Sequence, residues 1–590
     1  METKENHLQV PQSQDEISWY SSPSFFSLDP EDVLVRRAIC KVIDLPPNTM
    51  REFDFDILKI LVAQQRGKFY AIGAKCTYMD MALVGGSLGN KRVRCPLCGS
   101  CFSFMTGDIE DFPALDPLPC YKVDVEDGMV YVSIQQRDLM YSSRYSRLII
   151  PTPSYKTDET FVVIGGGPAA AMCLEYLRRF GFTGRLLAFM KDAELPYDRT
   201  RLNENLAVDV NTILLRNQEF YDQMRAEVFL STSVVHMSAK DKTLVRSDGG
   251  VTSFDKVFIA TGCEAKRLSQ DVPGAMDAIG MFYLRTPSDA NAIHAALNED
   301  IDLVVVGSSY LAMEVAVSCL PHVNSLTMIS RSAYPFHKIF GQVLGRRILN
   351  FYKDKGIIMR TSVKVVKVEM NPDTLAMTGI ILSDDSIIRT QMVIVCVGDT
   401  FATRFLKGSG VEMTPEGAVP VDQYLTTNIP YVYAGGDIAY APLHPYFNTT
   451  TTGSHYQIAQ VHGKTAASNM LGKPEPLKTI PFIIVCLGEI NLLYAGWIKN
   501  VDNVEIIGSL NEMKFAAYYM VGDKATGIVT CRLPGLASKF AESIHMEKYV
   551  QRHTLHDHAW SQHLFTCDVH DRDMDYDLDL DKLREMGLVF

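Results

Sequence analysis

Long apolar runs are missing from this 590-residue chain: none approaches the roughly 20 consecutive apolar residues that a membrane-spanning helix needs. An excess of basic residues is missing too, and the formal net charge of −12 argues against nucleic-acid binding, which needs clustered Lys and Arg. The N-terminal segment METKENHLQVPQSQDE has neither the apolar core of a secretory signal nor the Arg-rich, acid-poor character of a transit peptide. We therefore expect a cytoplasmic protein without a transmembrane segment, with a mitochondrial location as the alternative.

A disulfide framework is also absent. The thirteen cysteines are odd in number and mostly isolated inside apolar stretches, which is typical of reduced, buried thiols. Only Cys95, Cys98 and Cys101 crowd together. Histidine is missing from the 228 residues between Leu8 and Val235, so this part of the chain offers a metal no imidazole ligand.

The pattern of strands and turns divides the chain into several domains, as its length requires. Short alternating apolar runs with Gly, Pro and Asn turns predict a β domain before residue 138. Strand–turn–helix units then occur twice, as in Rossmann-like α/β domains, and an α+β domain follows them. The expected parts are a flexible leader at 1–33, the β domain at 34–137, a linker at 138–159, a first Rossmann-like domain at 160–273 and 392–471, a second at 274–391, the α+β domain at 472–556 and an acidic tail at 557–590.

The first Rossmann-like unit carries a glycine-rich turn, FVVIGGGPAAAM, between a strand and a helix. Gly165 permits the tight turn, Gly167 lets the backbone approach a pyrophosphate, and Ala170 keeps the helix close to the sheet. The free amides at the start of the helix favour the phosphates. About 25 residues further on, Asp192 ends a second strand and offers a carboxylate to a ribose hydroxyl. The pattern predicts a dinucleotide-binding site.

Two distant segments support this interpretation. KVFIATG ends a buried strand in a turn of small residues, and YVYAGGDIA places an aspartate where flavoproteins aim one at the ribityl chain of FAD. The expected cofactor-binding residues in these segments are Ala260, Thr261, Gly262, Gly436 and Asp437. Together the three segments resemble those of the flavoprotein reductases with two dinucleotide domains, the glutathione-reductase-like fold, and imply an FAD domain at 160–273 and 392–471.

The second unit, DLVVVGSSYLAMEVAV, follows the same scheme with fewer glycines. Gly307 is expected at its turn, and Glu314 falls where such reductases place a glutamate that contacts the nicotinamide. Ala333 stands where a ribose-binding acid would be expected. The pattern predicts NAD(P)H binding at 274–391 and leaves open both the choice between NADH and NADPH and a retained but weakened fold.

The segment from Cys76 to Cys101 has the loop spacing of a metal site and, with its flanks, resembles a Rieske domain. Rieske domains bind [2Fe–2S] with two Cys on one iron and two His on the other. Here the loops read Cys76-x-Tyr78 and Cys95-x-x-Cys98, so both histidines are replaced. The candidate metal ligands are Cys76, Cys95 and Cys98. The alternatives are no metal, [2Fe–2S] with non-standard thiolate ligands, and structural zinc, with Cys101 as a further thiolate.

From about Leu34 to His556 the chain resembles the apoptosis-inducing-factor-like flavoproteins that carry an N-terminal Rieske domain. This resemblance implies an FAD-dependent NAD(P)H oxidoreductase that passes electrons from the flavin to an iron–sulfur or other acceptor. It also implies that Arg199 is a flavin-site arginine and Glu314 the catalytic residue beside the nicotinamide. The acceptor and the oligomeric state are left open.

The departures from this family fall on the chemistry. Besides the histidines, Glu204 replaces the Lys that such reductases place near the flavin ring, and Ile484 replaces a flavin-proximal Trp. An anion near the ring opposes the negative charge of reduced flavin. We therefore expect weakened activity. The alternative is a non-catalytic descendant that acts as an interaction or regulatory protein with a metal-free Rieske-like domain.

Overall fold

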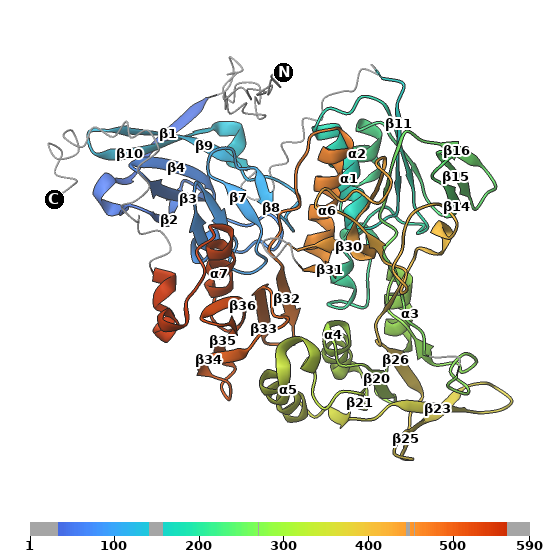
Figure 1. Ribbon diagram of the computed structural model, residues 1–590. Coiled ribbons are helices and arrows are strands. Elements are labelled where there is room, and N and C mark those ends of the chain that lie inside the picture. The colour runs from blue at the N-terminus through green and yellow to red at the C-terminus, as the bar shows by residue number, and fades with distance from the viewer. Residues whose placement is uncertain (1–32, 141–156, 269–270, 444–448, 454, 563–590) are drawn as a thin grey trace, which may run out of the picture.

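The computed structural model describes residues 33–140, 157–268, 271–443, 449–453 and 455–562 (Figure 1). The expected leader, linker and acidic tail lie mostly outside these residues. No helix in the described ranges combines the length and the apolar character that crossing a membrane requires.

The N-terminal β domain consists of two antiparallel sheets. Hairpins such as Asp127-Gly128, with φ of 49° and 76°, join its strands because both central residues adopt the left-handed conformation that suits a two-residue turn. The larger sheet has the order β1-β10-β9-β4-β3-β2 and the smaller one β5-β6-β7-β8. The bounds are β1 Leu34–Lys41, β2 Thr49–Phe55, β3 Leu58–Gln65, β4 Lys68–Gly73, β5 Ser87–Gly89, β6 Arg92–Arg94, β7 Cys101–Ser103, β8 Ile109–Asp111, β9 Cys120–Glu126 and β10 Met129–Gln135.

The first α/β unit is built on a parallel sheet in the order β13-β12-β11-β17-β29. Its helices α1 and α6 stand side by side (Figure 1), and they approach closely because a Cβ on Gly463 would lie 2.2 Å from the Ala169 carbonyl oxygen. The sheet and its helices are β11 Thr160–Ile164, α1 Pro168–Arg179, β12 Arg185–Phe189, α2 Gln218–Gln223, β13 Ala226–Phe229, β17 Lys256–Ile259, β29 Val432–Ala434 and α6 Tyr456–Met470. Smaller sheets flank it: β14 Val234–Ser238 with β15 Thr243–Arg246 and β16 Val251–Ser253, and β28 Val419–Pro420 with β30 Ala439–Pro442 and β31 Thr450–Thr452.

The second α/β unit repeats the scheme with a parallel sheet in the order β19-β26-β20-β21-β22. Its elements are β19 Met281–Phe282, α3 Pro287–Ala296, β20 Asp302–Val306, α4 Tyr310–Cys319, β21 Ser325–Ser330, α5 His337–Asp354, β22 Ile358–Thr361 and β26 Met392–Val395, with a flanking sheet of β23 Val365–Met370, β24 Met377–Leu382 and β25 Ile387–Arg389. The antiparallel pair of β18 Cys263–Ala265 and β27 Asp399–Phe401 links the two units.

One expected boundary is wrong. We assigned 392–471 to the first unit, but β26 pairs in parallel with β20 and is buried along its whole length. The second unit therefore includes Met392–Val395, because its backbone pairs with β19 and β20, and its four apolar residues are buried as in a parallel sheet that is covered on both faces.

The C-terminal domain is an antiparallel sheet in the order β32-β33-β36-β35-β34 with one long helix. Its elements are β32 Phe482–Cys486, β33 Asn491–Gly496, β34 Asn503–Ser509, β35 Lys514–Val521, β36 Lys524–Cys531 and α7 Leu536–His545. A short helical turn at His556–Gln562 follows, in which the Trp560 indole donates to the Tyr518 hydroxyl at 3.0 Å. The described chain thus continues beyond the expected end of the domain at 556, because Trp560 covers the apolar cluster under α7.

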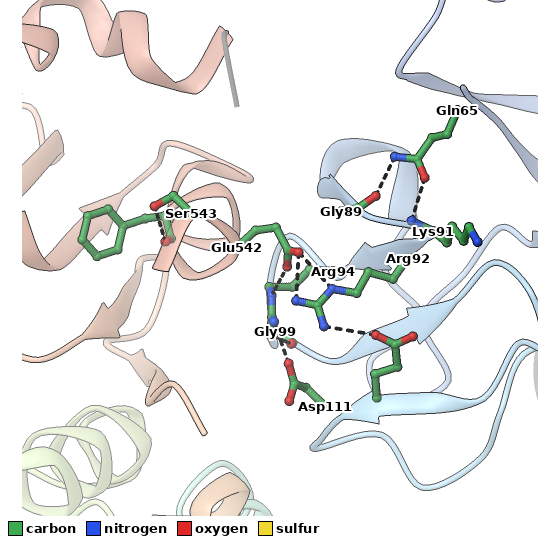
Figure 2. Close-up of polar contacts among 11 residues, drawn as sticks. Gln65, Gly89, Lys91, Arg92, Arg94, Gly99, Asp111, Glu542 and Ser543 are labelled. Carbon is green, nitrogen blue, oxygen red and sulfur yellow. Dashed lines mark hydrogen bonds and ion pairs between the residues drawn. The ribbon is translucent and has the colours of Figure 1, made fainter. Parts of the chain in front are cut away.

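Helix α7 joins the C-terminal domain to the N-terminal β domain through the buried carboxylate of Glu542 (Figure 2). Its two oxygens accept from Arg92 Nε at 2.9 Å and Arg94 Nε at 3.2 Å, and Arg94 also donates to Asp111 at 2.6 Å. Gly89 allows this approach, since a Cβ there would lie 2.3 Å from Glu542 Oε1. The two domains therefore share one buried ionic network.

Candidate functional site

A cavity of about 900 Å³ lies at the carboxyl ends of the strands in the first α/β unit. Its size suits a dinucleotide, and its position is where such sheets bind ligands. The expected cofactor residues that line it are Gly165, Gly167, Asp192, Arg199, Ala260, Thr261, Gly262, Gly436 and Asp437. Ala170 does not line the cavity. It is a buried residue of α1 that packs in the core of the first unit, as expected of a small residue that keeps the helix close to the sheet.

The turn before α1 leaves an open cradle for a phosphate group. At Gly165, φ is 134°, and a Cβ would lie 2.1 Å from the Ala260 carbonyl oxygen, so only glycine fits. Gly167 caps the helix in extended conformation, and a Cβ there would meet nothing within 4 Å. The start of α1 therefore lines the cavity with open space beside it, as a pyrophosphate requires.

Three buried polar atoms in the cavity wall have no hydrogen-bond partner within the described part of the chain: Thr261 Oγ1, His455 Nδ1 and Tyr456 Oη. Buried polar atoms are almost always paired, so these atoms point to a ligand. Burial lowers the pKa of His455 to about 4, so its ring is neutral. We did not predict His455 and Tyr456, because a lone His-Tyr pair at a helix start carries no distinctive sequence signal.

Two ion pairs hold the expected carboxylates at the rim of the cavity. Arg199 donates to Asp192 Oδ2 at 2.7 Å, and Arg285 lies 3.4 Å from Asp437 Oδ2. Arg199 also donates to the Tyr197 hydroxyl at 2.6 Å. The pairs fix the directions of both carboxylates, and Arg285 is a lining residue that the sequence did not reveal.

Glu314 lies on α4 and is held from two sides. Its Oε2 accepts from Asn203 Nδ2 at 2.5 Å, and its Oε1 from the Cys486 amide at 2.8 Å. Burial raises the pKa of Glu314 to about 8, and the charge of Glu204 adds to the rise, while the Cys486 amide opposes it. Neither Glu314 nor Gly307 is among the described residues that line the 900 Å³ cavity. Gly307 instead supports the turn before α4, where a Cβ would lie 2.2 Å from the Cys396 carbonyl oxygen.

The raised pKa of Glu314 predicts that stability falls as the pH rises from about 4.5 to about 8. In this window the folded state keeps a proton that the unfolded chain has lost, so the folded state binds more protons. Glu314→Gln should remove this dependence and be more stable than the wild type at pH 8.5, by on the order of 3 kcal/mol after allowance for partial exposure. Urea unfolding from pH 5 to 9 measures the difference, and a difference that does not grow with pH would contradict the assignment.

A second site lies in the N-terminal β domain, where the sulfur atoms of Cys76, Cys95 and Cys98 all lie within 4.8 Å of one another. Cys76 Sγ and Cys98 Sγ are 3.5 Å apart, and all three side chains are buried in an apolar cluster. The sequence also offered Cys101 as a fourth thiolate ligand. Its sulfur does not belong to this cluster of three and lies near Arg92 and Arg94 instead.

The thiols differ in their surroundings. Hydrogen bonds from Cys95 and Cys98, and then from the Tyr78 and Met79 amides, hold the pKa of Cys76 well below its usual range. Burial raises the pKa of Cys95 and of Cys98. The two neighbouring thiols, and after them the two amides, thus favour a thiolate at Cys76.

Tyr78, which occupies the first histidine position, points away from the thiols. Its hydroxyl donates to Asp198 Oδ2 at 2.8 Å and lies 3.1 Å from Thr200 Oγ1. Its ring stacks with Tyr456 at 6.4 Å between centroids. Since Thr200 and Tyr456 both line the large cavity, Tyr78 joins the metal loop to the wall of the cofactor site.

The residues present do not fit a histidine-ligated [2Fe–2S] cluster. Such a cluster needs two imidazoles on one iron. The two positions hold Tyr78, which is turned toward Asp198, and Cys98, whose sulfur lies among the other two. The donor set fits a metal bound by thiolates.

Comparison with known proteins matches two families in one chain. Residues 159–463 match the pyridine nucleotide-disulphide oxidoreductase family, and residues 36–122 match the Rieske [2Fe-2S] domain. Apoptosis-inducing factor 3 of Homo sapiens is 32% identical over 518 residues, which are 87% of this chain and 84% of that protein. The 5,5'-dehydrodivanillate O-demethylase ferredoxin reductase subunit of Sphingobium is 27% identical and aligns with 61% of this chain and 86% of its own length. Among solved structures, the covalent putidaredoxin reductase–putidaredoxin complex matches 69% of this chain and 98% of its own chain with a TM-score of 0.66 and 21% identity, which supports the fold.

Proposed function

The chain belongs to the pyridine nucleotide-disulphide oxidoreductase family and carries a Rieske-type domain, and from this premise we propose that it takes electrons from NAD(P)H through FAD to an iron–sulfur acceptor. The observation that carries the proposal is the large cavity, whose open cradle before α1 and three orphaned polar atoms fit FAD. We propose a cytoplasmic location, with the mitochondrion as the alternative that cell fractionation would reveal.

The residues that would hold FAD come from all three expected segments. The amides after Gly167 would take the pyrophosphate, Asp192 a ribose hydroxyl and Asp437 the ribityl chain. Thr261 and Tyr456 would find their missing hydrogen-bond partners on the same cofactor. When bound there, FAD would supply a ring that accepts a hydride and releases electrons.

NAD(P)H would be held by the second unit, whose turn at Gly307 repeats the tight turn at Gly165, with φ of 141° and 134°. Glu314 would face the nicotinamide, held in place by Asn203 and the Cys486 amide. Ala333 offers the ribose no carboxylate, so we propose that the coenzyme binds weakly.

The surroundings of Glu204 also favour slow turnover. Its charge is close enough to raise the pKa of Glu314, so it lies near the expected nicotinamide site. Arg201 donates to Glu204 at 2.8 Å and compensates part of its charge. The remaining negative charge disfavours reduced flavin, and we propose weakened activity.

The acceptor is proposed by analogy with the relatives. One relative is named a ferredoxin reductase subunit, and the solved complex joins putidaredoxin reductase to putidaredoxin. We propose that this chain likewise serves a separate iron–sulfur protein, because its own thiol site lacks the histidines of a Rieske centre.

The test is anaerobic stopped-flow reduction of the purified protein with NADH and NADPH. The wild type should carry flavin that bleaches slowly. Glu204→Lys should accelerate bleaching by about tenfold, or about 1.4 kcal/mol of barrier, because a cation favours the reduced ring. Glu219→Lys, the same charge change at an exposed site on α2, is the control. A colourless wild type that takes up no added FAD would overturn the proposal, and equal rates in both variants would contradict the role of Glu204.

A further inference from the structure

The thiol site of the N-terminal β domain has the dimensions of a single metal ion. A tetrahedral Zn²⁺ with Zn–S bonds of about 2.3 Å places its sulfur ligands about 3.8 Å apart. Cys76 Sγ and Cys98 Sγ are 3.5 Å apart, and Cys95 Sγ lies within 4.8 Å of both. One ion at the centre of the triangle reaches all three sulfurs with small side-chain adjustments.

The same geometry disfavours two irons. In a Rieske centre the ligands are divided between two irons, two on each, and Cys98 stands in the place of a ligand to the second iron. Its sulfur should then be separated from Cys76 by the width of the cluster, yet the two are in contact. The other ligand of the second iron is also missing, because the Tyr78 hydroxyl is bound to Asp198.

The chain around Cys98 is shaped to keep the sulfurs together. The turn Cys95-Pro96-Leu97-Cys98-Gly99 closes with Gly99 at φ 77°, and a Cβ at Gly99 would lie 2.5 Å from the Phe482 ring. The ligand turn is therefore clamped against β32 of the C-terminal domain. The Cys98 amide faces the Cys95 sulfur, and the Cys98 thiol donates to Ser100 Oγ at 3.2 Å. The amide can compensate the negative charge of a bound thiolate at Cys95, and the Ser100 hydroxyl can turn its proton toward Cys98 once that thiol is deprotonated.

The donor chemistry selects the metal. Thiolates without imidazole or carboxylate favour soft and borderline ions, and Zn²⁺ needs neither a redox partner nor inorganic sulfide. We propose that Cys76, Cys95 and Cys98 bind one Zn²⁺ as three thiolates, releasing the protons of the neutral thiols on binding, with the fourth coordination position left to a ligand from outside the protein. The centre is redox-inert, and this inference stands apart from the proposed flavin chemistry, which uses another cavity.

The experiment measures zinc, iron and acid-labile sulfide per chain in the full-length protein, as purified and after incubation with ZnCl₂ under reducing conditions. We expect about one zinc per chain and no sulfide. Replacement by Co²⁺ should give thiolate charge-transfer bands and the visible bands of a tetrahedral ion. Cys98→Ser should weaken zinc retention at least about tenfold, whereas Cys101→Ala, equally buried but outside the triangle, should retain it.

The proposal is overturned if the wild type holds two irons with two sulfides, if it takes up no zinc, or if Cys101→Ala loses zinc as Cys98→Ser does. The Co²⁺ spectrum of the wild type decides the matter should Cys98→Ser fail to fold. FAD content, measured on each sample, separates this result from the proposed function: an overturned zinc site leaves the flavin unchanged, and a colourless protein can still bind zinc.

Discussion

Replacing Gly167 with leucine should lower the affinity for FAD at least about 100-fold, or about 2.8 kcal/mol, while the apoprotein stays folded. The backbone at Gly167 is extended, with φ of −97° and ψ of −177°, so a side chain brings no strain. A Cβ there meets nothing within 4 Å, and the leucine would occupy the cradle before α1 that a pyrophosphate needs. Titration of the apoprotein with FAD, followed by flavin fluorescence, measures the loss, and circular dichroism checks the fold.

The neighbouring glycine provides a matched control for this prediction. A Cβ on Gly166 would make ordinary contact with Met190 at 3.4 Å, and Met190 is not among the described residues that line the cavity. Gly166→Ala should therefore bind FAD within a few-fold of the wild type, and Gly167→Ala should bind it more weakly. Similar affinities for these two variants, or full affinity in Gly167→Leu, would show that the cofactor does not pass this turn.

Replacing Glu542 with alanine should destabilise the protein by about 3–5 kcal/mol, since it leaves buried arginines without their shared carboxylate. Arg92 and Arg94 both bond to Glu542, and the side chain of Glu542 is fully buried (Figure 2). Asp111 and Glu110 bond to the terminal nitrogens of Arg94 and Arg92, so the Nε atoms of both arginines would lose their acceptor. Urea unfolding should show the loss in both the N-terminal β domain and the C-terminal domain.

A surface pair of the same chemistry is the control. Glu227 forms a two-bond ion pair with Arg185, and both side chains are about half exposed. Glu227→Ala should cost only about 0–1 kcal/mol, because water screens the pair and solvates the arginine that remains. If Glu542→Ala costs no more than Glu227→Ala, the buried network contributes little and the domains are held by apolar contacts alone.

The sequence was informative where a property depends on neighbouring residues. The turns at Gly165 and Gly307 could be predicted because the strand, the glycine and the helix follow one another within a short segment. The same holds for the β domain, whose alternating strands and turns are local patterns. Asp437 could also be placed, because its turn has a recognisable form.

The sequence was uninformative where a property depends on a distant partner. Tyr78 was expected at a ligand position, but its direction is set by Asp198, which lies 120 residues away. The strand Met392–Val395 joins the second unit because β20 pairs with it, and no local pattern states which sheet a buried strand enters. Arg285 belongs to the cavity only through its approach to Asp437, 152 residues away.

The network around Glu542 also delays the completion of the N-terminal β domain while the chain is synthesised. Arg92 and Glu542 are separated by 450 residues, so at about 5–20 residues per second the ribosome needs about 20 to 90 s to deliver the carboxylate after the arginine. Until then the nascent β domain carries the two arginines with only Glu110 and Asp111 as partners and without the carboxylate that they share, and Phe482 has not yet closed over the turn at Gly99. The first domain to be translated is thus among the last to be completed, and a chain truncated before α7 should be a substrate for chaperones and proteases.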